Sequence, residues 1–306
     1  MNSLNSQPAV STRRRSSSSL NGSRLTQFFI SIAVTLCIVV TLYPFLYVFS
    51  MSLSDPKYVI DRSVWLLPKG LTFDAYRLVL ENPFVWKAYS NTIWYTSIGT
   101  LINVIMTILA AYPLSRRTFV LRYPLMVFIV ITMFFSGGLI PTFIVVSDLG
   151  LYNTRWAMVL PGAVWAFNII IARTFFQSIP EELIEAAKID GANDLTILAR
   201  VVLPLSKPII AVLTLFYAVG HWNSYFNAVL YLSSSSLHPL QIYLQKILVA
   251  LSDQFAGATT AGIVRTAEVE QLKYSSIMVT ILPILFIYPF LQKYFVQGVM
   301  IGALKD

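Results

Sequence analysis

Hydrophobic residues run along this chain in long blocks, and the charged residues are confined to the segments between them. None of the 22 Lys and Arg residues or the 14 Asp and Glu residues falls within six windows. A helix needs about 20 residues to cross the hydrocarbon core of a bilayer. The pattern therefore predicts six transmembrane helices. The windows are Leu25–Ser54, Ala88–Ser115, Tyr123–Ser147, Trp156–Ala172, Pro208–Gln245 and Tyr274–Gln292.

Two of these windows depart from the length of a simple span. The fourth is short, but its helix can extend past Arg173, because the long arginine stem can carry its charge to the membrane surface. The fifth is too long for one helix and poor for two. Its second half, which holds Ser233–Ser236, His238 and Pro239, predicts a loop.

The N-terminus has two possible interpretations, a cleaved signal peptide or an uncleaved first span. The apolar stretch from Phe28 to Phe49 is longer than the roughly 7–15 residues of a secretory signal core. We therefore expect an uncleaved transmembrane helix over 25–54, preceded by a disordered basic tail over 1–24. Arg13–Arg15 in this tail predict a topology anchor rather than a twin-arginine signal.

Composition and charge agree with a membrane protein and predict its orientation. The chain is 56% hydrophobic and 12% charged, with a mean hydropathy of +0.68. Soluble domains are about half apolar and about a quarter charged. The 116–122 loop carries three arginines and the 148–155 loop carries one, so positive-inside bias places both termini and the 116–122 loop in the cytoplasm. The net charge of +8 follows from this bias and gives no reason to expect nucleic acid binding.

Several kinds of chemistry have no basis in this sequence. No Gly-Lys dipeptide occurs, so there is no P-loop, and His221, His238 and the single Cys37 are too few to predict a metal site. We expect Cys37 to be a small packing residue. The six windows contain no ionisable Asp, Glu, Lys or Arg, which disfavours an ion-coupled transporter and a membrane-bound enzyme. The chain is therefore expected to lack an energy source of its own.

Small and polar residues within the windows predict contacts between helices, and prolines predict bent helices. The polar and small residues are Asn91, Thr92, Ser97, Gly99, Asn103 and Thr107 in the second window and Asn168 in the fourth, and the prolines are Pro44, Pro141, Pro161 and Pro283.

The segment 181–205, "EELIEAAKIDGANDLTILARVVLPL", interrupts the apolar pattern with charged residues. Ser178 and Glu181 have the spacing of a capping box, with Pro180 in the first turn, and Gly191 is a typical helix terminator. A second short helix over Leu195–Val202, capped by Asn193 or Asp194 and ended by Leu203-Pro204, is expected to follow. This surface helix-turn-helix could rest on lipid headgroups, but its acidic residues favour a groove in a partner protein.

This segment resembles the cytoplasmic loop that identifies permease subunits of binding-protein-dependent ABC importers. The pattern is Glu-Ala-Ala, three residues, Gly, nine residues, Ile, one residue, Leu-Pro, with Val201 here in place of Ile. The resemblance implies that the loop couples the permease to an ATPase subunit. The residues that it assigns to coupling are Glu185, Ala186, Ala187, Asp190, Gly191, Ala192, Val201, Leu203 and Pro204.

The resemblance extends from about Ala88 to the C-terminus and is strongest to the carbohydrate-uptake branch. "FFSGGLIPTFIVVSDLGLYNTRWAMVLPG" and "FYAVGHWNSYFNAVLYL" are similar to permeases of complex-saccharide importers, and "KYFVQGVMIGALKD" is similar to maltose-type tails, with Asp306 in place of a glycine. Sugars bind through hydroxyl hydrogen bonds and aromatic stacking, so "GHWNSYFN" at 220–227 is a candidate substrate-binding segment, although an interfacial aromatic belt is the alternative. The candidate substrate-path residues are Asn103, Asn168, Trp222, Asn223 and Tyr225.

Together these features predict an all-α polytopic membrane protein with six transmembrane helices and the type I ABC importer permease fold. The five-helix core is expected over 88–295, with the coupling loop at 178–207 and a cytoplasmic tail at 296–306. Leu232–Lys273 is expected to be a loop that faces the binding protein.

The resemblance implies a bacterial cytoplasmic-membrane subunit that imports a sugar or oligosaccharide. Its expected partners are a second homologous permease, an ATPase dimer, an extracytoplasmic solute-binding lipoprotein and the lipid bilayer. No cofactor is expected on this chain, because ATP and Mg²⁺ would bind the partner ATPase. An ion-coupled secondary transporter and an ABC permease for a non-sugar solute remain the alternatives.

Overall fold

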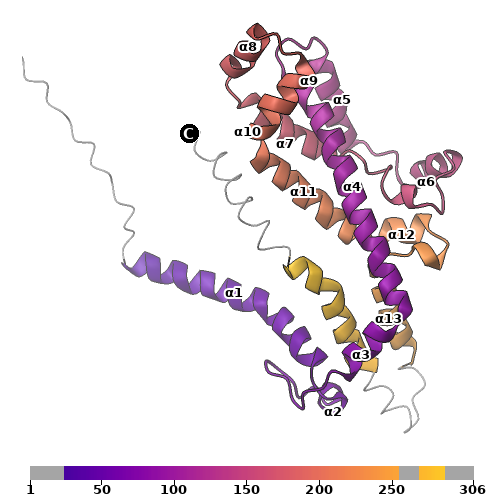
Figure 1. Cartoon of the computed structure of the whole chain (residues 1–306). Helices are drawn as coiled ribbons and strands as arrows, with labels where there is room; N and C mark the ends of the chain where they lie inside the picture. The colour runs from indigo at the N-terminus through magenta and orange to yellow at the C-terminus, as the bar shows by residue number, and fades with distance from the viewer. Residues whose placement is uncertain (1–23, 255–268, 287–306) are drawn as a thin grey trace, which may run out of the picture.

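The helices of this chain follow its apolar windows, although several of them are interrupted. The computed structural model describes residues 24–254 and 269–286, and over these ranges the chain is helical, with a single isolated β-bridge between Ser54 and Leu71 (Figure 1). The elements are α1 (Arg24–Ser52), α2 (Pro56–Ile60), α3 (Asp74–Glu81), α4 (Pro83–Ser115), α5 (Arg122–Phe134), α6 (Leu139–Asp148), η1 (Arg155–Met158), α7 (Ala166–Gln177), α8 (Glu181–Ile189), α9 (Asp194–Ile197), η2 (Leu198–Val202), α10 (Leu203–Leu205), α11 (Lys207–Trp222), α12 (Phe226–Tyr231), η3 (Ser235–Leu237), α13 (Leu240–Gln254) and a last helix, Val269–Phe286.

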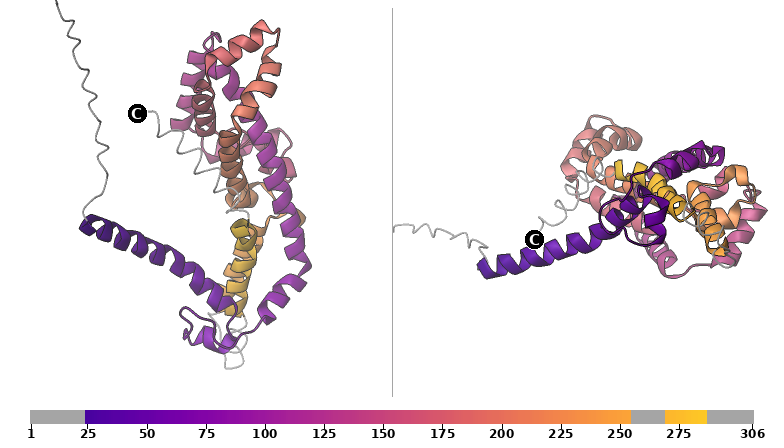
Figure 2. Two further views of the ribbon diagram at one scale, coloured as in Figure 1. Left: turned by 60° about the vertical axis from the view of Figure 1, so that its left-hand side comes forward. Right: turned by 90° about the horizontal axis from the view of Figure 1, so that it is seen from below.

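Helix α1 extends away from the other helices along most of its length (Figures 1 and 2). Its span Thr26–Ser52 is 27 residues long, and 0% of its most apolar window is buried within the chain. Only its C-terminal end packs, through Met51, against Val59 and Val64 of the following segment. Cys37 is exposed on this helix, so it does not pack against other described parts of the chain as we expected from the sequence. The predicted tails 1–24 and 296–306 lie, apart from Arg24, outside the described residues.

Helix α4 is the central element of the bundle and runs along its whole length (Figure 1). It has 33 residues and begins at Pro83, five positions before the predicted window. The earlier start has a local cause, because the Asn82 side chain accepts a hydrogen bond from the Phe84 N–H at 3.0 Å and Pro83 occupies the first helical turn. Helix α4 packs mainly against α7 and α11, so it forms the inner wall against which the rest of the chain is arranged.

The third apolar window forms two helices rather than one straight span. Helices α5 and α6 meet at an angle of 114°. The break falls at Ser136-Gly137-Gly138, where Gly138 has a φ of +85°, a conformation that is unfavourable for residues with a Cβ. A second bend of 84° separates the segment Asp194–Leu205 from α11. The first bend agrees with the bent helix expected near Pro141, whereas the second lies at none of the four prolines for which a bend was expected.

The fourth window, Trp156–Ala172, does not form a continuous helix, so this part of the prediction is wrong. It contains η1, an irregular stretch and the start of α7, which has only 12 residues. The irregular stretch is stabilised by neighbouring side chains, because the Asn103 amide donates to the Gly162 carbonyl at 2.6 Å. Over the described residues, three helices are long and apolar enough to cross a membrane, or up to five if each bent pair is one span. The count of six spans remains a prediction.

Hydrogen bonds between helices connect α4 to its neighbours, as the polar residues of its window predicted. Thr107 and Tyr217 share a hydrogen bond of 2.6 Å, and the Asn103 side chain lies 3.1 Å from the ring nitrogen of His221. Gly99 is placed directly against the same ring, where a Cβ would lie 2.5 Å from Nε2. Close approach of α4 and α11 therefore requires glycine at position 99.

The end of the molecule opposite α8 contains α2, α3, η3 and α13 (Figure 1). The loop predicted around 233–239 is confirmed, apart from the short turn η3. The segment Leu232–Lys273, predicted as a loop, contains the 15-residue helix α13 and the start of the last helix, so that prediction is wrong. The polar residues of α13 made this segment resemble a loop in the sequence. Its apolar residues Leu240 and Ile242 are buried against α4 and its neighbours.

We expect Gly99→Ala to destabilise the chain by about 1–3 kcal/mol, because the added Cβ overlaps a buried ring in a packed interface. The measurement is the midpoint of thermal unfolding of the detergent-solubilised protein. Gly162→Ala is the matched control, because its Cβ would meet its nearest neighbour at an ordinary 3.7 Å. Equal midpoints for the two variants would show that contact at Gly99 does not set the spacing of α4 and α11.

Candidate functional site

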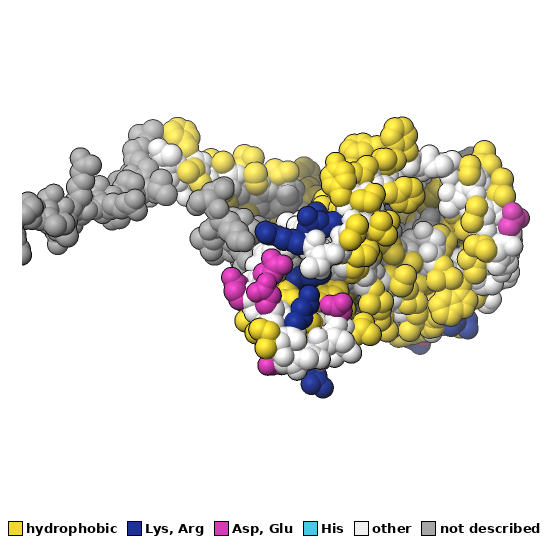
Figure 3. Space-filling view, turned by 90° about the horizontal axis from the view of Figure 1, so that it is seen from above, with side chains coloured by type: hydrophobic (Ala, Val, Ile, Leu, Met, Phe, Trp, Pro, Cys, Tyr) yellow, Lys and Arg dark blue, Asp and Glu magenta, His cyan; other side chains and the backbone are white. Residues whose placement is uncertain are grey.

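The predicted coupling segment lies at one end of the bundle, where α8 and α9 project beyond the ends of α4 and α7 (Figure 1). Viewed from this end, acidic and basic side chains gather around the projecting segment, beside a broad hydrophobic surface (Figure 3). The charged interruption of the sequence is therefore a surface structure at the edge of the apolar body.

Helix α8 begins differently from the sequence prediction. Pro180 is its N-cap residue and no side chain caps it, so the predicted Ser178–Glu181 capping box is wrong. The Ser178 hydroxyl instead donates to the Phe175 carbonyl at 2.7 Å, because Ser178 still belongs to the end of α7. Glu181 and Glu182 do lie in the first turn, where the helix dipole favours negative charge.

Helix α8 ends in the geometry that Gly191 predicted. The Ala192 N–H donates to the Ala187 carbonyl at 3.0 Å, and the Gly191 N–H donates to the Lys188 carbonyl at 3.0 Å. This pair of bonds is a Schellman motif, and Gly191 occupies its left-handed position with a φ of +80°. The turn fixes the direction in which the chain leaves α8.

The second helix of the segment begins at Asn193 and is longer than expected. The Asn193 side chain accepts hydrogen bonds from the N–H of Thr196 at 2.9 Å and from its hydroxyl at 2.8 Å. The helix then passes through the wide turns of η2 into α10, so Leu203-Pro204 does not end it as predicted. The wide π-type turns alter the backbone hydrogen-bond pattern just before Pro204, which has no N–H to donate. The chain turns at Ser206 instead.

One face of the segment is anchored in the main core of the protein. Ile184 of α8 and Ile197, Leu198 and Val202 of the second helix are buried in one cluster with side chains of α4, α7 and α11. Movement of the segment would therefore act directly on these three helices. Such a contact is the physical requirement for a coupling element.

The opposite face of the segment has no covering within the described chain. Ile189 and Leu195 are 87% and 71% exposed, which is unusual for large apolar side chains on a charged surface. Of the predicted coupling residues, Glu185, Ala186, Asp190, Gly191 and Pro204 are exposed, and Ala187, Ala192, Val201 and Leu203 are half-buried.

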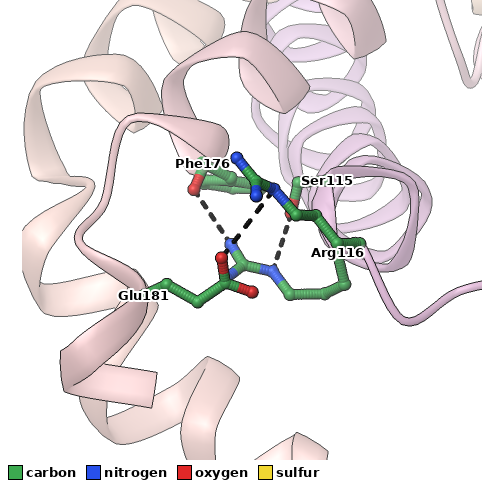
Figure 4. A network of polar contacts seen from close by, with 5 residues as sticks. Ser115, Arg116, Phe176 and Glu181 are labelled. Atoms are coloured by element: carbon green, nitrogen blue, oxygen red, sulfur yellow. Dashed lines mark hydrogen bonds and ion pairs between the residues drawn. The ribbon is translucent and has the colours of Figure 1, made fainter. Parts of the chain in front are cut away.

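Arginines attach the base of the segment to α4. Arg116, which follows α4, donates from Nη2 to the Phe176 carbonyl at 2.9 Å and from Nε to the Ser115 hydroxyl at 2.9 Å (Figure 4). Burial lowers the pKa of Arg116, although an arginine remains charged at any physiological pH. The Arg117 and Glu181 side chains form a looser, exposed pair at 3.8 Å.

A second arginine makes an equivalent bond from the other side. Arg173 of α7 donates from Nε to the Leu114 carbonyl at 3.0 Å. Arg116, at the end of α4, therefore satisfies a carbonyl at the end of α7, and Arg173 of α7 satisfies a carbonyl at the end of α4. The sequence had indicated Arg116 only as a topology signal and Arg173 only as a snorkelling residue, because their acceptors are backbone groups.

The candidate substrate-path residues are separated by the fold. Trp222 is buried in a core cluster with Val79, Leu240 and Val279. Asn103 is buried, and its side chain is engaged by the Gly162 carbonyl and by the ring of His221. The candidates that reach the surface are Asn223, which is exposed, and Tyr225, which is 36% exposed, whereas Asn168 is fully buried and its side-chain amide makes no hydrogen bond with the described residues.

Metal chemistry has no support in the part of the chain that the structure covers. Within residues 24–254 and 269–286, no cluster of three or more His, Cys, Asp or Glu side chains could hold a metal ion.

Comparison with known proteins identifies the class to which this arrangement belongs. Residues 103–301 match the family described as binding-protein-dependent transport system inner membrane component. The chain belongs to this family. It is therefore a multi-pass membrane permease subunit, not an enzyme, and its transport depends on an ATPase and a solute-binding protein.

Two individual permeases of sugar and polysaccharide transport systems are similar to this chain in sequence. It is 42% identical over 262 residues, 86% of this chain and 92% of the relative, to the polygalacturonan/rhamnogalacturonan transport system permease protein YtcP of Bacillus subtilis. It is 29% identical over 248 residues, 79% of this chain and 84% of the relative, to the melibiose/raffinose/stachyose import permease protein MelC of the same species.

A solved structure shares the fold. One chain in the crystal structure of a bacterial ABC transporter involved in the import of the acidic polysaccharide alginate is similar, with 40% sequence identity and a TM-score of 0.80. The match covers 90% of this chain and 99% of that chain. The predicted fold class, the type I importer permease, is confirmed.

We expect Arg116→Gln to loosen the base of the coupling segment by about 1–3 kcal/mol, because it leaves partly buried carbonyl and hydroxyl groups without their charged donor. Hydrogen–deuterium exchange of residues 178–197 should become faster. Arg117→Gln is the control, since its exposed pair with Glu181 contributes little. Unchanged exchange in Arg116→Gln would contradict an anchoring role.

Proposed function

We propose that this chain forms part of the translocation path for an oligosaccharide and receives the force of ATP hydrolysis through the segment 181–204. The observation that carries this proposal is the two-faced structure of that segment. Its inner face is buried among α4, α7 and α11, and its outer face exposes Ile189 and Leu195 beside charged residues. A helix with one anchored face and one uncovered face is suited to a groove in a partner protein.

The coupling role is assigned to the residues on and around the uncovered face. Glu185 and Asp190 would supply charge, Ala186, Ala187 and Ala192 would permit close approach, and Gly191 would fix the angle between the two helices. Val201, Leu203 and Pro204 would transmit the movement to α11. We propose that ATP and Mg²⁺ bind the ATPase subunits and that this chain binds no cofactor.

We further propose that the complex contains a second, homologous permease. Helix α1 supports this assignment, because its apolar surface is uncovered by the rest of the chain. Lipid covers part of such a surface in any membrane protein, but an extended first helix also provides a natural contact for a second membrane subunit. A solute-binding protein would dock at the opposite end from α8.

The proposed substrate is a saccharide that carries carboxylate groups. Two of the similar proteins are described as transporters of acidic polysaccharides. The permease for polygalacturonan or rhamnogalacturonan is 42% identical to this chain, and the chain from the alginate importer is 40% identical. The relative named for neutral sugars is only 29% identical. Among the candidate path residues, Asn223 and Tyr225 are the ones that could contact a sugar, because Trp222 is needed for packing.

We propose that both termini and the segment 181–204 are cytoplasmic. Cysteines placed at Ser16 and Asn193 of a Cys37→Ser background should then resist impermeant thiol reagents in intact cells, and a cysteine at Ser235 should react. Asn193 and Ser235 are both exposed, so access and not burial decides the result. Labelling of Asn193 from outside would contradict both the orientation and the coupling role.

We expect Gly191→Val to abolish coupling between ATP hydrolysis and transport. A side chain at a φ of +80° raises the energy by about 1–2 kcal/mol and would redirect the second helix. Glu185→Lys should act by charge reversal and Ala186→Leu by blocking close approach. The measurement is the ATPase activity of purified complexes, stimulated by loaded binding protein, at equal subunit stoichiometry.

Gly150→Val is the matched control for Gly191→Val. Gly150 also has a left-handed φ, +68°, and open space around its Cβ position, but it lies in the loop between α6 and η1. Both variants should show similar strain, and only Gly191→Val should lose stimulated ATPase activity. Full stimulation in Gly191→Val would leave the segment as an interfacial helix without a coupling role.

A further inference from the structure

A cleft of about 720 Å³ opens between the start of α4 and the segment from η3 to α13, at the end of the molecule opposite α8. Lys87 and Lys246 both line it, and none of the lining residues that the structure describes is acidic. Neither lysine forms an ion pair with an acidic residue of the described chain. The cleft therefore presents uncompensated positive charge in a concave site of the size that binds small molecules.

The wall of the cleft is fixed by buried side chains of α4. The Asn91 amide donates to the carbonyls of Ser236 at 2.8 Å and His238 at 3.1 Å. The Tyr95 hydroxyl donates to the Leu237 carbonyl at 2.8 Å, between these two contacts. Because α4 holds three successive carbonyls, those of Ser236, Leu237 and His238, the site is preformed rather than dependent on a ligand.

Lys246 is held in place at the mouth of the cleft. Its ammonium group lies 3.2 Å from Nδ1 of His238, and Nε2 of the same ring lies 3.3 Å from the Leu232 carbonyl. Burial and the neighbouring ammonium lower the pKa of His238, so the neutral ring can accept from Lys246 and donate to Leu232. One of the three ammonium protons is engaged and the others remain available to a ligand.

The remaining groups of the cleft suit a sugar ring. Phe84 is 68% exposed, and Tyr243 also lines the cleft. Both aromatic side chains can stack on the apolar face of a pyranose, and the hydroxyls of Ser235 and Ser236 can bond to its hydroxyl groups. Two ammonium groups beside them would bind a carboxylate through charge-assisted hydrogen bonds.

We propose that this cleft is an extracytoplasmic binding site for a uronate unit of an acidic oligosaccharide, separate from the path through the membrane. The inference rests on the proposed function and orientation. An acidic loop of the binding protein is the competing occupant, but a narrow cleft with aromatic and hydroxyl groups around its charges fits a sugar acid better than a protein surface.

The test uses the purified complex of permease and ATPase subunits in phosphatidylcholine nanodiscs, without binding protein. The probes are digalacturonate and the uncharged galactobiose, and the measurement is the Kd of each. We expect Lys87→Gln with Lys246→Gln to weaken digalacturonate binding about tenfold or more and to leave galactobiose unaffected. Added salt should weaken only digalacturonate binding. Lys57→Gln, an exposed lysine of α2 at the same end of the molecule, is the control and should change neither Kd.

Two outcomes would overturn the proposal. Wild-type complex could fail to bind digalacturonate, or the double variant could bind it as tightly as the wild type. In the second case, a loss of affinity of the double variant for the binding protein, measured separately, would identify a protein-docking surface. Saccharide uptake by wild-type proteoliposomes with binding protein present tests the proposed function separately, because a complex that transports saccharide while failing these binding assays contradicts the cleft alone.

Discussion

A backbone N–H or C=O group inside a lipid bilayer needs a hydrogen-bond partner within the protein. This requirement explains how α4 contacts the other helices of the chain. The helices around α4 are repeatedly interrupted. The interruption before α7 is satisfied by side chains: Asn103 bonds to the Gly162 carbonyl, and Tyr217 accepts from the Trp165 N–H. At the other end of α4, Asn91 bonds to the turn of η3. Two of these three partners, Asn91 and Asn103, come from the long helix α4, and the third, Tyr217, comes from α11.

The same arrangement connects the coupling segment to the membrane helices. The second helix of the segment is buried against α4, α7 and α11, and Arg116 and Arg173 join the ends of α4 and α7. A push on α8 would therefore be delivered to a rigid group of three helices rather than absorbed by a flexible loop. Helix α5 also packs against α4 and α7, and the glycine break at Gly138 separates α6 from α5.

The two ends of α4 have different chemistry, and the proposed functions divide accordingly. One end carries the acidic coupling segment with its uncovered Ile189 and Leu195, which suits a protein partner. The opposite end carries a preformed cleft that has two lysines and no acidic residue among its described lining, which suits an anionic sugar. Helix α4 contacts both the coupling segment and the cleft. Binding of substrate at the cleft and of the ATPase at the coupling segment would therefore both act on α4.

The sequence by itself determined the class of protein, the apolar windows and the Gly191 turn, and it limited the cap of the next helix to Asn193 or Asp194, because these features depend on local composition and on backbone conformation. It failed at the fourth window, where side chains of α4 and α11 supply the hydrogen bonds that decide the local structure. It also failed at the Ser178–Glu181 capping box, because Ser178 belongs to the end of α7, and at the end assigned to Pro204, because the wide turns of η2 lead into α10. Trp222, a candidate for the substrate path from the sequence, is a core residue in the structure. Only the tertiary structure could bring Lys87 and Lys246 to one cleft or place Arg116 against Phe176, since residues far apart in sequence share no local signal.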